Sequence, residues 1–260
     1  MTQGCSETLR LGCVKYLNAR PLIHGWPGPV DFDHPAALSK KLADGDLDVA
    51  LVSSFEYLRQ PIYTIVDEVA IGSDGQVYSV ILAHRGPLAE LKEIALDPAS
   101  QTSVNLLQCL LAEEGLNPRF VPLSAHGEIT SNRARLLIGD QAIRFRQQQS
   151  GDWKLWDLGA AWKSAVGLPF IFALWLVRPE IQNASAIADL LRIRRDQNLA
   201  SLDQLIGQQR EFPAEFCQTY YRDHLRFGFA EREKQGLLKF RSLCERHGIL
   251  SADEAALRLA

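Results

Sequence analysis

Short apolar runs alternate with polar, helix-forming segments over the first two thirds of the chain. The runs at 47–52 (LDVALV) and 170–177 (FIFALWLV) are almost continuously apolar, which is typical of strands covered on both faces. Further strands are expected at 9–14, 30–33, 76–83, 93–96, 135–138 and 153–158. Helices are expected over 35–45, from the capping-box pattern at 53–56, over 100–114, after 139–140 and around 161–165. This alternation predicts an α/β fold with parallel or mixed sheets and helices on both faces.

The expected strands at 76–83 and 170–177 bracket a middle segment of about 90 residues that has its own strands and helices. We therefore expect two lobes, with the bracketing strands carrying the chain into the second lobe and back. The first lobe comprises residues 1–83 and 178–260, and the second comprises residues 84–177. Beyond Ile181 the strand pattern stops, and apolar residues at helical spacing predict three or four helices.

The composition is that of an ordinary globular protein and disfavours several kinds of partner. Hydrophobic residues make up 47% of the 260 positions, and the formal charge of −3 argues against a nucleic-acid or anionic-membrane surface. The five cysteines are scattered and never spaced as CxxC, so neither a disulfide framework nor a zinc site is expected. The N-terminus lacks the pattern of an export signal, and the most apolar run is shorter than the roughly 18 residues of a membrane span. We expect a cytoplasmic protein; no oligomeric state is predicted.

Small polar residues follow several of the expected strands, at the places where helices begin. Helix N-termini present unpaired backbone N–H groups and a partial positive charge, so they bind anions. Because ligands bind at the carboxyl ends of strands in such sheets, these residues are candidates for a carboxylate clamp in a cleft between the lobes. The candidate binding residues are Arg20, Ser53, Ser54, Ser100, Thr102, Ser103 and Asp140. Each hydroxyl residue can instead be an ordinary helix cap, Asp140 a cap rather than a catalytic acid, and Arg20 a solvated surface residue.

Motifs for several reaction classes do not occur in the sequence. It has no glycine-rich phosphate loop, no GxGxxG, no GxSxG and no HExxH, and its six histidines are dispersed. Nucleotide hydrolysis, classical dehydrogenation and zinc hydrolysis therefore lose support. The residues by themselves predict a protein that binds a small anion, without indicating a reaction.

Four separated motifs resemble those of a known enzyme family. They are 15–21 (KYLNARP), 47–54 (LDVALVSS), 135–140 (RLLIGD) and 167–175 (GLPFIFALW). In this order they are similar to the chorismate dehydratases of the futalosine route to menaquinone, whose fold is that of type II periplasmic binding proteins. The resemblance covers about residues 8–180. Val166 stands where the family pattern has threonine, so a hydroxyl contact from that position is in doubt.

The resemblance implies conversion of chorismate to 3-[(1-carboxyvinyl)oxy]benzoate with loss of water, without a nicotinamide, flavin or metal. It also implies that Asn18 and Ser79 are catalytic. A neutral amide has no usable basic lone pair, so our hypothesis is that Asn18 orients the substrate and that the substrate's own enolpyruvyl carboxylate takes the proton. Ser79 then donates to the departing hydroxyl or positions a carboxylate. Without the resemblance, Asn18 is interpreted as a helix cap and Ser79 as a small residue on a hinge strand.

Other functions remain open from the sequence. A non-catalytic binding protein for a small carboxylate would share the fold and leave chorismate unchanged, although no export signal is visible. A 1,4-dihydroxy-6-naphthoate synthase, the sister enzyme of the same pathway, would need a cleft large enough for a nucleoside. That family has a Pro-Asn-Asp-Thr-type first loop, unlike residues 16–21 here (YLNARP). A regulatory binding domain is a third alternative, but no DNA-reading module is recognised.

Overall fold

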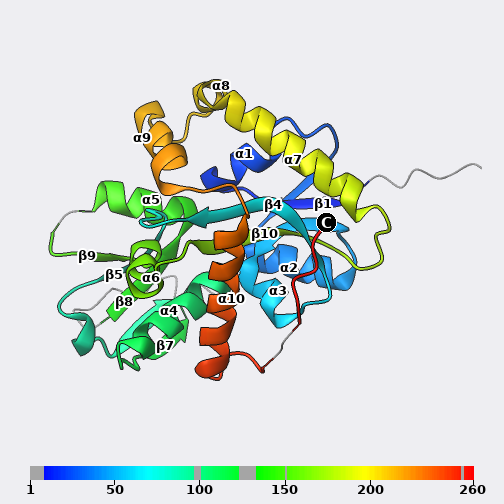
Figure 1. Ribbon diagram of the computed structural model, residues 1–260. Coiled ribbons are helices and arrows are strands. Elements are labelled where there is room, and N and C mark those ends of the chain that lie inside the picture. The colour runs from blue at the N-terminus through cyan, green and yellow to red at the C-terminus, as the bar shows by residue number, and fades with distance from the viewer. Residues whose placement is uncertain (1–8, 97–100, 123–132, 150, 253–254) are drawn as a thin grey trace, which may run out of the picture.

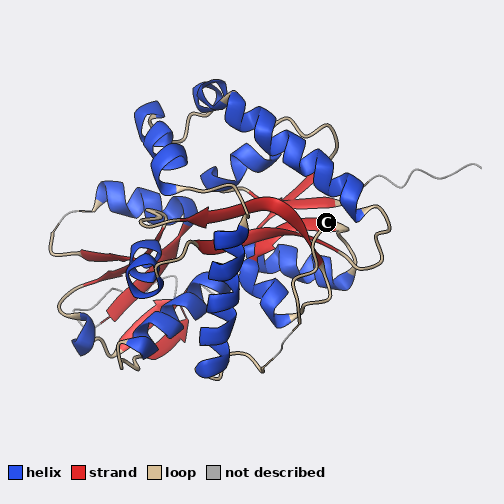
Figure 2. Ribbon diagram, in the orientation of Figure 1, coloured by secondary structure: helices blue, strands red, loops and turns tan. Residues whose placement is uncertain are grey.

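The computed structural model describes residues 9–96, 101–122, 133–149, 151–252 and 255–260, whose arrangement is shown in Figure 1. Strands and helices alternate along most of the chain, and helices cover the faces of the sheets in Figure 2. The strands are β1 (Leu11–Val14), β2 (Val30–Asp33), β3 (Val49–Ser53), β4 (Thr64–Ser73), β5 (Val80–His84), β6 (Glu93–Leu96), β7 (Arg119–Pro122), β8 (Arg133–Ile138), β9 (Lys154–Asp157) and β10 (Phe170–Val177). The α-helices are α1 (Arg20–Ile23), α2 (Pro35–Asp44), α3 (Ser54–Arg59), α4 (Gln101–Glu113), α5 (Gly139–Gln148), α6 (Leu158–Val166), α7 (Ala184–Ala200), α8 (Leu202–Gln208), α9 (Ala214–Thr219) and α10 (Glu231–Arg246). Two 3-10 turns, η1 (Leu17–Ala19) and η2 (Leu88–Glu90), and one π-helical turn, η3 (Tyr220–His224), complete these elements.

The first sheet has the strand order β2-β1-β3-β10-β4. β1 pairs in parallel with β2 and β3, whereas β10 runs antiparallel to β3 and β4. Every residue of β3 is buried, and all residues of β10 except Ala173 are buried. Both strands are therefore covered on both faces, as their continuous apolar runs predict.

The second sheet has the strand order β7-β6-β8-β5-β9. β6 pairs in parallel with β7 and β8, whereas β5 runs antiparallel to β8 and β9. The two sheets thus share one plan, with three parallel strands and an antiparallel strand in the fourth place of the order. This confirms the predicted α/β fold class with mixed sheets.

The chain changes sheets earlier than the sequence pattern indicates. Sequence analysis assigned residues up to 83 to the first lobe and residues 84–177 to the second. β5 pairs within the second sheet and β10 within the first, so the chain crosses between 73 and 80 and returns between 157 and 170. The expected boundaries therefore do not match the sheet membership of these two strands. The cause is that both strands are almost wholly buried and apolar, and such a pattern does not reveal which sheet a strand joins.

Sequence analysis did not identify β4 and β7. The middle of β4 carries Asp67 and Glu68, and Glu68 has a φ of 65°. These residues interrupt both the apolar pattern and the extended backbone, so the pattern does not predict this strand. β7 lies at the edge of the second sheet, is only partly buried and ends at Pro122, as edge strands commonly do. Both strands lack the apolar run by which the other strands were found.

The chain beyond β10 is largely helical, as predicted, and its last residues return to β4. Ile65 N–H donates to Arg258 O at 2.8 Å, and Ala260 N–H donates to Ile65 O at 3.0 Å. α10 packs against β10 of the first sheet and against α4, which lies between β6 and β7 of the second. Gly236 permits this close packing, because a Cβ at that position would lie 2.0 Å from Pro169 O. None of the helices that the structure describes is both long enough and apolar enough to span a bilayer.

Candidate functional site

A pocket lies between the two sheets, where the carboxyl ends of the parallel strands β1, β3 and β8 meet, as expected for this class of fold. Its volume is about 60 Å³. Small-molecule sites commonly measure roughly 300–1,000 Å³, so this pocket must widen to hold a ring-sized ligand. Its lining comprises Val14, Tyr16, Asn18, Pro35, Leu51, Val52, Ser53, Ile71, Val77, Ser79, Val80, Ser103, Ile138, Gly139, Phe172 and Ala173.

Asn18 lies in η1 and lines the pocket. The N-cap positions of η1 and α1 are Tyr16 and Ala19, so the interpretation of Asn18 as a helix cap is wrong. The Asn18 side-chain oxygen Oδ1 is buried and has no hydrogen-bond partner among the described residues. A buried acceptor in that state costs about 1–3 kcal/mol. The amide oxygen is therefore available to a hydrogen-bond donor on a ligand.

Asp140 holds the segment that carries Asn18. Asp140 is the second residue of α5, but its side chain does not cap that helix; it accepts Leu17 N–H at 2.9 Å instead. The expectation that Asp140 is a helix cap is thus wrong, and Asp140 does not line the pocket as a binding residue would. Burial raises the pKa of the Asp140 carboxyl, with the hydrogen bond from Leu17 opposing this shift.

Ser79 lies in the segment where the chain crosses between the sheets, directly before β5. The preceding residue, Tyr78, has a φ of 69°, a left-handed conformation that costs a non-glycine residue about 1–3 kcal/mol. Asp157 stabilises this conformation, because its carboxylate accepts Val77 N–H at 3.0 Å and Tyr78 N–H at 2.8 Å. Ser79 O accepts Gly139 N–H at 2.8 Å. These contacts fix Ser79, which is 1% exposed, in the pocket wall.

Ser53, Ser54 and Thr102 form a buried hydroxyl cluster that joins the two sheets. Ser53 Oγ hydrogen-bonds Thr102 Oγ1 and accepts Thr102 N–H at 3.0 Å. Ser54 Oγ donates to Ile171 O at 2.6 Å, and Thr102 Oγ1 accepts Phe55 N–H at 2.9 Å. The capping-box interpretation is therefore wrong, because Thr102, rather than the N-cap residue Ser53, bonds the first turn of α3.

These contacts separate the predicted hydroxyl ligands into two groups. Ser54 and Thr102 do not line the pocket, and their side chains are already hydrogen-bonded within the protein. Ser53 and Ser103 do line it. Ser100 lies outside the described residues.

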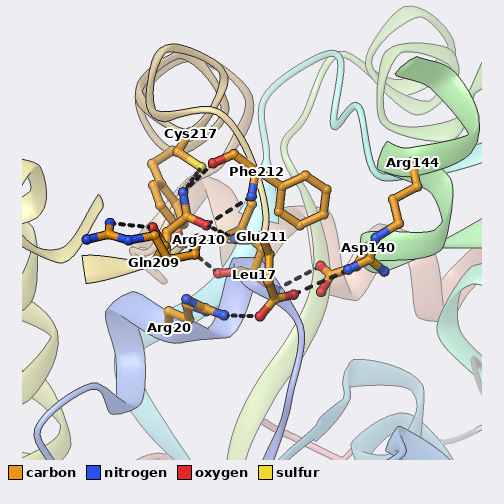
Figure 3. A network of polar contacts seen from close by, with 10 residues as sticks. Leu17, Arg20, Asp140, Arg144, Gln209, Arg210, Glu211, Phe212 and Cys217 are labelled. Atoms are coloured by element: carbon orange, nitrogen blue, oxygen red, sulfur yellow. Dashed lines mark hydrogen bonds and ion pairs between the residues drawn. The ribbon is translucent and has the colours of Figure 1, made fainter. Parts of the chain in front are cut away.

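Arg20 lies outside this pocket. Figure 3 shows its guanidinium beside Glu211, with which it forms an ion pair. Glu211 also pairs with Arg144 of α5 at 3.3 Å, so this carboxylate links α1 to the second lobe. Arg20 and Glu211 line a separate, larger pocket of about 610 Å³, which shares Val14 and Tyr16 with the first. Arg20 is therefore next to the predicted site but is not part of its described lining.

The electrostatics of the pocket depend on dipoles rather than on formal charges. None of the described residues that line it carries a charged side chain. Three helices begin at its wall, since Ser53 precedes α3, Ser103 lies in the first turn of α4, and Gly139 opens α5. The partial positive charge of these helix starts and the serine hydroxyls suit an anion, while the N–H groups of Phe55, Thr102 and Gly139 already bond within the protein. In the part of the chain that the structure describes, no three His, Cys, Asp or Glu side chains gather as a metal site requires.

The family model for menaquinone biosynthesis matches residues 9–246. The chain belongs to the menaquinone biosynthesis family. A chorismate dehydratase from Thermus thermophilus is 31% identical over 253 residues, which cover 88% of this chain and 93% of the Thermus protein. The resemblance recognised from four motifs is thereby confirmed, and the family match extends beyond it through α10.

Solved structures confirm the fold of this member of the menaquinone biosynthesis family. A protein from Archaeoglobus fulgidus aligns with a TM-score of 0.73 and 19% identity, covering 95% of this chain and 100% of that chain. The periplasmic aliphatic sulphonate binding protein SsuA from Escherichia coli aligns with a TM-score of 0.63 and 14% identity, covering 94% of each chain. At these identities the likeness concerns the fold alone, and it is the predicted periplasmic-binding-protein-like fold.

Three residues beside the site were missed by sequence analysis. Asp157 is the last residue of β9 and caps α6 by accepting Ala160 N–H at 3.0 Å, so its N-cap position could have been recognised. Tyr220 and Tyr221 contact the site from η3, where no motif marks them. The departure at Val166 has little bearing on the pocket, because Val166 ends α6 and is absent from the described lining.

Proposed function

We propose that this protein is a chorismate dehydratase that converts chorismate to 3-[(1-carboxyvinyl)oxy]benzoate and water. The observation that carries the proposal is the meeting of Asn18 and Ser79 in one pocket, in a chain of the menaquinone biosynthesis family. The similarity to the Thermus thermophilus chorismate dehydratase over 88% of this chain supports it. We further infer a cytoplasmic enzyme of the futalosine route whose two lobes part to admit the substrate.

The pocket supports binding of a carboxylated ring. Apolar side chains such as Leu51, Ile71 and Phe172 offer surface to the ring, while the starts of α3, α4 and α5 offer a partial positive charge and serine hydroxyls to its carboxylates. Ser53 and Ser103 are the hydroxyl residues that we assign to this role. Arg20 would serve the second carboxylate only after release from Glu211, because the two side chains now form an ion pair.

The absence of a basic side chain from the described lining supports substrate-assisted proton transfer. The proton on the ether-bearing ring carbon is acidified by conjugation through the ring alkene to the ring carboxylate. We propose that the enolpyruvyl carboxylate of chorismate takes this proton. The resulting dienolate expels the neighbouring hydroxyl, which takes up the abstracted proton and leaves as water, and the ring becomes aromatic.

Asn18 and Ser79 have complementary roles in this proposal. The free Oδ1 of Asn18 accepts a hydrogen bond from the substrate and orients it, since an amide oxygen accepts hydrogen bonds but is not a base. Ser79 donates its hydroxyl hydrogen to the departing hydroxyl or to a carboxylate. Each role stabilises a geometry close to the transition state rather than supplying a new covalent step.

A direct test is to incubate the purified protein with chorismate and follow ultraviolet absorbance with mass detection. We expect loss of chorismate and a product lighter by one water. Unchanged chorismate together with measurable binding would indicate a receptor and contradict the proposal. Turnover of cyclic futalosine in place of chorismate would instead indicate the 1,4-dihydroxy-6-naphthoate synthase reaction.

A further inference from the structure

The π-helical turn η3 places two consecutive tyrosines against the two residues to which catalysis is assigned. η3 spans Tyr220–His224, and both Tyr220 and Tyr221 are buried. Such turns frequently occur at functional sites. Because consecutive residues of a helical turn point in different directions, the two rings reach different segments of the chain.

Tyr220 bonds Ser79. Its hydroxyl donates to Ser79 Oγ at 2.7 Å. A serine hydroxyl has one hydrogen to donate and two lone pairs that accept. With one lone pair taken by Tyr220, the hydrogen of Ser79 is left for an acceptor in the pocket that Ser79 lines. A hydrogen bond received by a hydroxyl also polarises it and strengthens its own donation.

The surroundings of Tyr220 keep it in this donor role. Its ring stacks on Phe216, with centroids 5.5 Å apart and an angle of 15°, and meets Tyr78 edge-on at 6.5 Å. Burial raises the pKa of the Tyr220 phenol, so the hydroxyl keeps its hydrogen at neutral pH. The packing therefore fixes the position of the ring, and the hydroxyl keeps the hydrogen that it donates to Ser79.

Tyr221 makes the corresponding contact to the segment of Asn18. Its hydroxyl donates to Leu17 O at 2.9 Å, and Leu17 N–H is held by Asp140 on the other side. The residue that precedes Asn18 is thus bonded through both its N–H and its carbonyl. The amide oxygen of Asn18 remains without a partner beside this doubly held residue.

We propose that Tyr220 and Tyr221 are positioning residues of the dehydratase, Tyr220 acting through Ser79 and Tyr221 through the segment of Asn18. This inference rests on the proposed function and adds a part of the chain that the four sequence motifs do not include. One helical turn in the last quarter of the chain thereby contacts two segments, the turn after β1 that carries Asn18 and the crossing before β5 that carries Ser79.

The test uses Tyr220→Phe and Tyr221→Phe, which remove one hydroxyl each and keep the aromatic packing. We expect kcat for chorismate to fall about tenfold in each, with KM changed by less than about twofold, because the lost bonds orient reacting groups rather than hold the ring. Tyr57→Phe is the matched control. Its hydroxyl is also buried and bonded, accepting Arg258 N–H at 2.8 Å, but lies outside the pocket. It should keep the wild-type kcat.

A double-mutant cycle separates positioning from a structural effect. In a Ser79→Ala background, Tyr220→Phe should cause no further loss of kcat, because its partner is already gone. Tyr221→Phe should cause in that background the same loss that it causes alone. A loss from Tyr220→Phe that is equally large with and without Ser79 would overturn the assignment of Tyr220.

The inference and the proposed function fail in different ways. A wild-type protein that does not turn over chorismate contradicts the function and with it this inference. An active wild type whose two phenylalanine variants, folded by circular dichroism, keep wild-type kcat contradicts the inference alone.

Discussion

Two groups of polar side chains lie where the sheets meet, and they differ in where their hydrogen bonds go. In the hydroxyl cluster of Ser53, Ser54 and Thr102, the side chains bond one another or nearby backbone. In the pair formed by Asn18 and Ser79, the amide oxygen has no described partner and the serine hydroxyl receives a bond while keeping its hydrogen. Ser54 and Thr102 are complete without a ligand, Ser53 also lines the pocket, and Asn18 and Ser79 keep groups for a ligand.

This difference separates the groups that stabilise the fold from the groups that can bond a ligand. Buried polar groups in native proteins are nearly always bonded, so an unbonded one at a pocket indicates a ligand contact. The hydroxyl cluster therefore contributes mainly to the contact between the lobes. In the proposed function, Asn18 and Ser79 contribute to the reaction. Each prediction below tests one side of this contrast.

The largest effect is expected for Asn18→Ala. Loss of the amide should lower kcat about a hundredfold or more, because the substrate is no longer oriented in the pocket. Asn18→Asp should lose most turnover as well, since it sets a negative charge against a dianion. The unfolding free energy should be retained or raised in Asn18→Ala, because the buried acceptor without a partner is removed.

Steady-state kinetics and denaturant unfolding check this prediction. Asn105→Ala is the matched control, since it removes an amide from α4 that does not line the pocket. Near-wild-type turnover by Asn18→Ala would show that its amide does not act on the substrate.

Thr102→Val should show the opposite behaviour. The variant keeps the shape of the side chain but leaves Phe55 N–H without its partner and removes the hydroxyl bond to Ser53 Oγ, which still accepts the backbone N–H of residue 102. We expect the unfolding free energy to fall by about 1–3 kcal/mol and kcat to change by less than about threefold. Urea unfolding monitored by tryptophan fluorescence measures the first quantity. Thr219→Val, at an exposed position, is the control; a large loss of kcat with no loss of stability in Thr102→Val would contradict the contrast.

A smaller effect is expected for Glu211→Gln, which tests the role of Arg20. Removing the negative charge that pairs with Arg20 should free its guanidinium for a substrate carboxylate and lower KM about two- to threefold. Glu180→Gln removes a similar partner from Arg178, which lines neither pocket, and should leave KM unchanged. An unchanged KM in Glu211→Gln would assign Arg20 to structure rather than to binding.

The smallest effect concerns the pH dependence of stability at Asp140. Burial raises the pKa of this carboxyl above the ordinary value of 3.8, so the folded protein binds the proton more tightly than the unfolded chain does. Ionisation of Asp140 therefore lowers the free energy of unfolding as the pH rises above the ordinary pKa of an aspartate. The unfolding free energy of Asp140→Asn minus that of the wild type should increase between about pH 4 and neutrality. A difference that stays constant with pH would contradict the shift.

Much of the fold could be predicted from the sequence because several strands are continuous apolar runs. The continuous apolar runs of β3 and β10 are readable without a structure, whereas β4, with Asp67 and Glu68 at its middle, is not. The sheet to which a wholly buried strand belongs is decided by tertiary packing. For this reason the crossings before β5 and β10 were expected too late in the chain.

Several residues of the candidate site could be predicted from the sequence, but the hydrogen bonds that they make could not. The resemblance to a family pointed to Asn18 and Ser79, and the structure brings both to one pocket. Helix-start patterns identified Ser53, Ser54 and Thr102, yet a sequence does not show that hydroxyls distant in the chain bond one another. Tyr220 reaches Ser79 across 141 positions, a contact that no local pattern can indicate.

The most direct test of this contrast is a crystal structure of the protein with bound 3-[(1-carboxyvinyl)oxy]benzoate. We predict that the ring occupies the pocket of Asn18 and Ser79, with both side chains within hydrogen-bond distance of the ligand and with Ser54 and Thr102 still bonded as they are now. A product bound beside Arg20 and Glu211, with Asn18 Oδ1 still unbonded, would contradict the account.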